Sequence, residues 1–453
     1  MHLLVIEDRP GESRSAWIVG GRPAALVFRR DHWPAAGDVH LARVTAHAPD
    51  SSGAFLLLDE ATGLAGFLKR RGRASPPEVG RIMPVTVAAH DPAAGDKQAR
   101  VEPGVRLAGR YLTLAAPGRG LALSDSLKAA AEMHPRLEAA LGPLAARAAV
   151  RVNSATAHVP VEAVAGEAGR LAARLGELEA AVAAGGPARR LHRPPFLEVA
   201  LAAGPAGRFR LLGDAPFGLR GPGEEAAASF PDLAGVEDAE DAFAATGVAD
   251  WLEEVAAGRL ALAGGGHLRL ALAPSGIVVD VDAGARPARG DRRELLRRLG
   301  TETAATLARA AAALRLQGLV VVDLPVPRDA AFRRALEGAF RDAFAAAGLG
   351  RDVAGPNRHG IVSIALARAG TPVPAFLDMP GLPERLRREA RLFAALRPLA
   401  RRRALPPGAT TVPLRLERDL VPLLNDLGLQ PAWEAKLGLA LAIEAADTDV
   451  NAG

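Results

Sequence analysis

The sequence predicts a multidomain protein of mixed α+β and α/β class with a small β-barrel near its N-terminus. The chain has 453 residues, more than the roughly 250–300 at which a single hydrophobic core stops growing. Short apolar runs separated by Gly and Pro turns fill its first quarter, a pattern typical of barrels. Strand-like runs then alternate with long helical segments in the second half, which favours an α/β unit.

Composition and charge narrow the class of protein. Hydrophobic residues are 49% and charged residues 24% of the chain, which excludes a disordered protein. The net charge of +5 permits a polyanionic partner without requiring one, since 51 acidic side chains accompany 56 basic ones. There is no cysteine, so thiolate zinc sites and cysteine nucleophiles are excluded. The N-terminus shows no signal peptide and no long apolar span follows, so we expect a cytoplasmic protein without a membrane span.

The first three segments carry most of the predicted strands. Residues 1–36 predict a short antiparallel ribbon that is too small to bury a core by itself. Residues 37–106 hold five strand-like runs with regular turns, which predict the barrel. Residues 107–192 combine the strands RYLTLAA and AAVRVNS with two helical segments.

The remaining segments alternate strands and helices. Residues 193–258 contain FLEVALAA and RFRLLG, both interpreted as strands, and then a helical stretch. Residues 259–369 read strand, helix, strand, helix, strand, which implies a mainly parallel sheet covered on both faces. Residues 370–453 predict a basic helix and a small βαβ-like end.

Two aspartates follow apolar strands in the α/β unit. Asp280 in VVDVD and Asp323 in VVVD are expected at one sheet edge, where parallel strands bring their carboxyl ends together. Mg²⁺ takes one or two such carboxylates plus phosphate oxygens, and hydrolysis of a phosphodiester is the matching chemistry. Asp282 lies two residues on, on the same strand face, and enlarges the site. The alternative is that these acids open loops or cap helices.

The barrel segment combines aromatic and cationic side chains. Phe55 and Phe67 occupy apolar strand positions near Lys97 and Arg100, and aromatic rings beside cations stack on single-stranded bases. The alternative is that both rings fill the core. The chain contains no Walker phosphate loop, nucleophile elbow or HExxH motif.

Together these segments resemble the ribonuclease E/G family along nearly the whole chain. LAGRYL at 107–112 and the preceding GDVHLARVTAHAPDSSGAFLLLDE are similar to the family's S1 domain and its exit. GGGHLRLALAPSGIVVDVDAG is similar to the family's SGGYLVIDQTEALTVIDVNSG, and the 43-residue separation of Asp280 and Asp323 fits the family's metal-binding aspartates.

The resemblance implies a domain order and several site residues. It implies an S1-type OB barrel (37–106), a 5′-sensor-like region (107–192) and a ribonuclease H-like part formed by residues 1–36 with 193–258. A DNase I-like nuclease domain (259–369) and a small C-terminal domain (370–453) follow. By the same resemblance, the residues that contact RNA are Phe55, Phe67, Lys97, Arg151 at the 5′-phosphate, and Arg358. Arg100 is added to this set because it lies in the cationic part of the barrel segment.

The chain departs from the family pattern at several positions. Asp282 stands where the family has asparagine, Val152 where it has the threonine beside the sensor arginine, and IALAR (364–368) where it has MSRQR. The cysteine pair that forms the family's zinc link is missing. Any homo-oligomer is therefore expected to form without zinc.

We therefore expect a short, divergent ribonuclease G-like paralogue. Its expected activity is Mg²⁺-dependent endonucleolytic cleavage of single-stranded RNA that leaves 5′-phosphate and 3′-hydroxyl ends, with Asp280 and Asp323 holding the metal and Asp282 assisting. A catalytically weakened RNA-binding module is the first alternative. An unrelated metal-dependent phosphohydrolase is the second.

Overall fold

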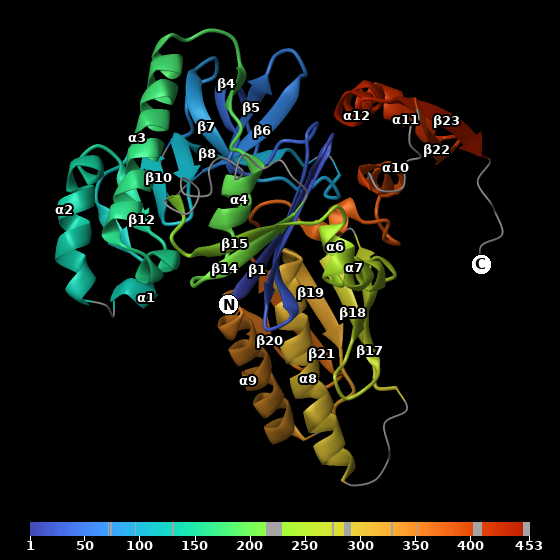
Figure 1. The fold of residues 1–453 in the computed structure, drawn as a ribbon. Coiled ribbons are helices and arrows are strands. Elements are labelled where there is room, and N and C mark those ends of the chain that lie inside the picture. The colour runs from blue at the N-terminus through green and yellow to red at the C-terminus, as the bar shows by residue number, and fades with distance from the viewer. Residues whose placement is uncertain are drawn as a thin grey trace.

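The computed structural model describes residues 1–453 apart from 71, 73–74, 96, 129–130, 214–228, 274–275, 285–290, 328, 351, 402–409 and 447–453. The described part is a mixed α+β protein with several sheets, one of which closes into a barrel (Figure 1). Within those residues, no helix combines the length and apolar character needed to cross a membrane.

The predicted five-stranded barrel is confirmed. Its order is β4-β5-β6-β8-β7, a pairing of β4 with β7 closes it, and β6 runs parallel to β8. This is an OB-like arrangement. Alternate strand residues such as Val44, Leu56 and Val85 fill the interior, which leaves the intervening side chains on the outside. The strands are β4 (Val39–His47), β5 (Gly53–Asp59), β6 (Leu64–Lys69), β7 (Ile82–Ala89) and β8 (Ala99–Pro103), with β13 (Arg189–His192) beside β4.

The N-terminal strands form a sheet with a later part of the chain. Its order is β15-β14-β1-β2-β3, and β1 pairs with β14 in parallel. FLEVALAA, which we interpreted as a strand, forms helix α4 (Phe196–Ala202) instead. That prediction is wrong because the helical turn buries Phe196, Ala200 and Leu201 together, whereas the apolar content of a short run does not distinguish a strand from a helix. The strands are β1 (His2–Arg9), β2 (Glu12–Val19), β3 (Arg22–Arg30), β14 (Phe209–Gly213) and β15 (Leu233–Asp238).

The region after the barrel packs two helices against a four-stranded sheet of order β11-β12-β10-β9. Arg110 and Tyr111 of LAGRYL both bond to buried Asp232, at 2.6 Å each. The hexapeptide thus ties this region to the N-terminal sheet. The elements are β9 (Val105–Ala108), β10 (Leu112–Ala116), β11 (Leu121–Leu123), α1 (Asp125–Lys128), α2 (His134–Ala145), β12 (Ala149–Val152) and α3 (Val161–Ala183), with 3₁₀ turns η1 (Ala131–Met133) and η2 (Ser154–His158).

The α/β unit contains a six-stranded sheet of order β16-β17-β18-β19-β21-β20. The elements before its first helix are α6 (Ala242–Ala245), α7 (Val248–Ala256), β16 (Arg259–Ala261), β17 (His267–Ala273) and β18 (Gly276–Asp282). Those that follow are α8 (Arg292–Ala313), β19 (Gly318–Asp323), α9 (Ala330–Ala346), β20 (Val353–Ala354) and β21 (Ile361–Leu366).

The expectation of a mainly parallel sheet covered on both faces is wrong. Only β18 and β19 pair in parallel among the strands of this sheet that the structure describes. The chain turns back at β17–β18 and again at the short strand β20, which the sequence pattern did not reveal. Both long helices, α8 and α9, lie on one side of the sheet (Figure 1). On the other side Val278 and Leu319 are 44% and 42% exposed.

From Leu392 onward the C-terminal region has a hydrophobic core of its own, which includes Phe393, Leu414 and Trp433, whereas Phe376 and Leu386 belong to the core that contains the α/β unit. Strands β22 and β23 pair in parallel around two short helices. The elements are η3 (Val373–Phe376), α10 (Glu384–Leu396), η4 (Arg397–Ala400), β22 (Thr411–Glu417), α11 (Leu420–Asp426), α12 (Leu429–Leu437) and β23 (Ala440–Ala446).

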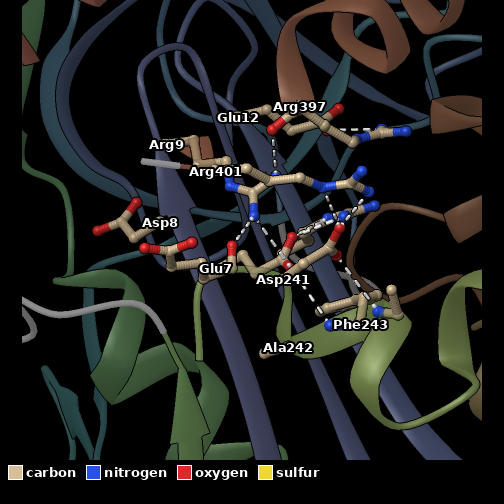
Figure 2. Close-up of polar contacts among 12 residues, drawn as sticks. Glu7, Asp8, Arg9, Glu12, Asp241, Ala242, Phe243, Arg397 and Arg401 are labelled. Carbon is tan, nitrogen blue, oxygen red and sulfur yellow. Dashed lines mark hydrogen bonds and ion pairs between the residues drawn. The ribbon is translucent and has the colours of Figure 1, made fainter. Parts of the chain in front are cut away.

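Buried ion pairs join this C-terminal region to the N-terminal sheet (Figure 2). Glu12 on β2 pairs with Arg397 at 2.7 Å and with Arg30 at 3.3 Å. Arg9 donates to the Arg397 carbonyl oxygen. A more exposed pair, Arg401 with Asp241, links the same region to the start of α6 (Ala242–Ala245). The buried charges of Glu12 and Arg30 need such partners, because an unpaired buried charge costs on the order of several kcal/mol of stability.

Candidate functional site

The two phenylalanines of the barrel form one outward-facing platform. Phe55 on β5 lies opposite Phe67 on β6 in the strand register. Their ring centroids are 5.3 Å apart with 56° between the planes. Both are half-buried and belong to the wall of a cavity of about 380 Å³, outside the barrel core.

Cationic side chains surround this platform. Lys97 and Arg100 line the same cavity, and Arg100 lies next to Phe67 in the register of β8 with β6. Neither cation has an acidic partner in the described part of the chain. Four predicted RNA-contacting residues, from β5, β6, β8 and the approach to β8, therefore meet at one place.

The opposite wall of the cavity comes from the α/β unit. Gln317, just before β19, and Arg368, just after β21, both line the cavity. Backbone hydrogen bonds from His90 to the Gly370 oxygen and from Gly370 to the Ala88 oxygen, both 3.0 Å, fix the two parts together. Sequence reasoning missed both residues, because only this docking brings them to the barrel.

The two strand-end aspartates lie side by side. Asp280 and Asp323 are partners in the parallel register of β18 and β19, which places neighbouring strands about 4.8 Å apart. Both side chains are exposed on the face of the sheet that α8 and α9 leave open. Among the described residues, neither carboxylate has a hydrogen-bond or ion-pair partner.

Asp282 lies near this pair but is already engaged. One of its oxygens accepts a hydrogen bond from the Gly284 N–H at 2.8 Å, and the other lies 3.2 Å from the Arg269 guanidinium. The Gly284 hydrogen bond and then His267 and Arg269 hold the pKa of Asp282 below its usual range. Arg269 is also the register partner of Asp280, and sequence reasoning missed it.

The remaining two predicted residues lie elsewhere. Arg358 is in the turn before β21. The first residue of β21, Ile361, pairs with Asp323, so Arg358 lies at the end of the sheet that carries Asp280 and Asp323. There its guanidinium bonds to His359 at 2.9 Å. Arg151 is on β12 in the separate four-stranded sheet, where with Lys128 it lowers the pKa of Asp125.

The cavity and the carboxylate pair are at opposite ends of one strand. Gln317 precedes the first residue of β19 and Asp323 is its last. Six residues of extended chain span about 20 Å. A ligand that touches both places must therefore lie along the sheet.

The donor set at the carboxylate pair fits Mg²⁺. Mg²⁺ binds through one or two carboxylates and completes its shell with water and phosphate oxygens. Across the described ranges, no cluster of three or more His, Cys, Asp or Glu side chains forms a metal-binding group. Asp280 and Asp323 are the residues that would hold the ion.

A comparison with protein-family models and with curated proteins found no match for this chain.

Proposed function

We propose that this protein is a Mg²⁺-dependent endoribonuclease that binds single-stranded RNA and cleaves it near Asp280 and Asp323. The RNA would bind in the cavity lined by Phe55, Phe67 and Gln317, which we call the barrel cavity. One observation carries the cleavage proposal: the two carboxylates are in register on neighbouring parallel strands, on an open face of the sheet. Two unpaired carboxylates this close repel each other unless a cation lies between them.

The chain's own side chains supply binding and orientation. Phe55 and Phe67 stack on bases, at about 1–3 kcal/mol per base, while Lys97 and Arg100 neutralise phosphates. Asp280 and Asp323 hold the metal, and a bound Mg²⁺ supplies charge compensation at the phosphodiester and a more acidic water. We assign Asp282 a positioning role, because Gly284 and Arg269 already engage its oxygens. The expected products carry 5′-phosphate and 3′-hydroxyl ends.

The test is cleavage of a 5′-monophosphorylated, A/U-rich single-stranded RNA in Mg²⁺ and in EDTA. The Asp280→Asn/Asp323→Asn variant should lower the cleavage rate at least about 100-fold, because metal catalysis contributes several kcal/mol. Its RNA affinity in EDTA should stay unchanged, since the barrel cavity is intact. The matched control is Asp250→Asn/Asp426→Asn, which alters two exposed carboxylates elsewhere and should keep full activity. Equal cleavage by the two double variants would refute the assignment.

A second candidate function is RNA binding without cleavage, and the position of Arg269 favours it. This guanidinium is the register partner of Asp280 and pairs with Asp282, so it reduces the negative charge that attracts a cation. Tight binding whose affinity falls steeply with salt, with no cleavage in Mg²⁺ or Mn²⁺, would establish this function instead. Weak, salt-insensitive binding would point to an unrelated phosphohydrolase.

A further inference from the structure

Gln317 is a buried polar side chain with unmet hydrogen-bonding capacity. It is only 8% exposed, and neither its amide nitrogen Nε2 nor its amide oxygen Oε1 has a hydrogen-bond partner among the described residues. Leaving such groups buried and unpaired costs a folded protein stability. A glutamine kept in this position therefore suggests a ligand that completes its hydrogen bonds.

The position of Gln317 is fixed by its neighbours. Gly318, the next residue, has φ +81° and pairs with Leu366 as β19 meets β21. The Arg368 guanidinium lies 3.8 Å from the point where a Cβ on Gly318 would be. Gln317 and Arg368 both contribute to the lining of the cavity.

The other residues that line the cavity determine what kind of ligand fits. Phe55 and Phe67 offer flat apolar surface, and Lys97, Arg100 and Arg368 supply three cations against the single carboxylate of Asp91. A purely apolar ligand would leave the amide unpaired, and a simple anion would satisfy its donor alone. A planar group that carries a hydrogen-bond donor beside an acceptor and is attached to phosphates would match the amide, the aromatic rings and the cations together.

We infer that Gln317 reads the edge of a nucleobase that stacks on Phe55 and Phe67, so that this chain discriminates between bases at the cavity. Adenine is the closest match, since glutamine bonds in bidentate fashion to its N6 and N7. This inference rests on the proposed RNA binding and deepens it. Gln317 is a specificity-determining residue, because it selects the base and takes no part in cleavage.

The experiment measures the affinity of the full-length protein for oligoadenylate, oligouridylate and oligocytidylate of about ten nucleotides, within the range of OB-fold site sizes. Binding is followed in EDTA by fluorescence anisotropy. The wild-type protein should prefer oligoadenylate by about tenfold or more, as a bidentate pair does. Gln317→Met should reduce this preference to about twofold or less, and should leave the affinity for the disfavoured RNA unchanged.

Two further measurements separate recognition from folding. Gln317→Met removes two unpaired polar atoms at similar volume, so its melting temperature should equal or exceed that of the wild type; a clear drop would mean that the amide is a structural hydrogen-bonding group. The matched control is Gln98→Met, an exposed glutamine on the rim of the same cavity, which should keep the preference.

The outcomes distinguish failure of the inference from failure of the proposed function. RNA binding without base preference in the wild type, or with a preference that Gln317→Met retains, overturns the role of Gln317 and leaves RNA binding intact. If Gln98→Met loses the base preference and Gln317→Met keeps it, the base is recognised at the rim of the cavity, and the role of Gln317 is overturned as well. No measurable binding to any oligonucleotide removes the proposed RNA binding, and the inference falls with it.

Discussion

At the residue scale, the imidazole of His90 couples protonation to stability. It lies at the junction of the barrel with the α/β unit, where its backbone N–H donates to Gly370. Its ring packs edge-on against Trp33, with centroids 6.2 Å apart. Burial, and then the nearby charge of Arg385, lower the pKa of His90 from 6.5 to about 4. The folded protein therefore holds this ring neutral.

We expect His90→Gln to flatten the dependence of stability on acid. Below pH 6.5 His90 becomes protonated in the unfolded chain, whereas in the folded chain it stays neutral until about pH 4. The stability present above pH 6.5 is therefore lost as pH falls towards 4, by up to about 3 kcal/mol. Urea unfolding at pH 7, 5.5 and 4 measures the effect. The exposed His47 provides the control: His47→Gln should retain the wild-type slope, and an equally steep slope in His90→Gln would contradict the prediction.

At the element scale, helix α3 is attached to the strand after the barrel through one carboxylate. Glu167 accepts hydrogen bonds from the backbone N–H groups of Arg110, Tyr111 and Leu112 at 2.8–2.9 Å. Burial raises the pKa of Glu167, and those three N–H groups oppose the rise. The close approach needs glycine at 109, because a Cβ there would lie 2.5 Å from the Glu167 carboxyl carbon.

Gly109→Ala should therefore destabilise the protein by about 2–4 kcal/mol, through overpacking and loosened hydrogen bonds to the carboxylate. Gly169→Ala is the matched control on α3, at an exposed position where a Cβ meets nothing within 4 Å. It should raise stability by up to about 1 kcal/mol, because alanine favours the helix. Thermal unfolding of both variants checks the contrast. A Gly109→Ala protein as stable as Gly169→Ala would show that Glu167 is free to move.

Element by element, the sequence was informative wherever local pattern decides structure. The strand-like runs and regular turns of 37–106 predicted the barrel, and the apolar runs before Asp280 and Asp323 predicted their strands. It failed where tertiary packing decides. FLEVALAA suits a strand by its apolar content, yet packing around Trp17, whose indole N–H donates to the Ala200 oxygen, stabilises a helix. The alternation of strands and helices suggested a sheet covered on both faces, although Val278 and Leu319 lie on an open one.

At the scale of the whole molecule, the cavity shows what a sequence pattern cannot supply. Phe55 and Phe67 were identifiable as a pair because they lie on neighbouring strands of one barrel. Gln317 and Arg368 come from a part of the chain about 250 to 310 residues further on. They reach the cavity because the barrel docks through the Ala89–Gly370 bridge, which no local signal predicts.

Docking of the C-terminal region onto the N-terminal sheet depends on buried charge as well as apolar contact. Glu12 is 4% exposed. Burial raises its pKa, but Arg397, Arg30 and Arg14 lower it by more, so the pKa of Glu12 lies below its usual range. The C-terminal region has a separate core from Leu392 onward, so weakening this junction should release that part of the chain before the rest of the molecule unfolds.

We expect Glu12→Gln to lower stability by about 3–5 kcal/mol, because it leaves Arg30 and Arg397 buried with one partner fewer. The folded-state pKa of Glu12 is depressed, so its contribution is complete above the unfolded value near 4.5 and is lost as pH falls through the folded value. Acid unfolding of the variant should therefore depend less on pH below 4.5. Limited proteolysis at pH 7 should cleave first in the segment that connects the C-terminal region to the rest of the chain.

Glu162→Gln is the control, since Glu162 and Arg136 form an exposed pair at 3.0 Å whose loss costs about 1 kcal/mol or less. If both variants lost the same small amount of stability, the apolar contact of Gly11 with Phe393 and Leu429 would be sufficient to hold the two regions together.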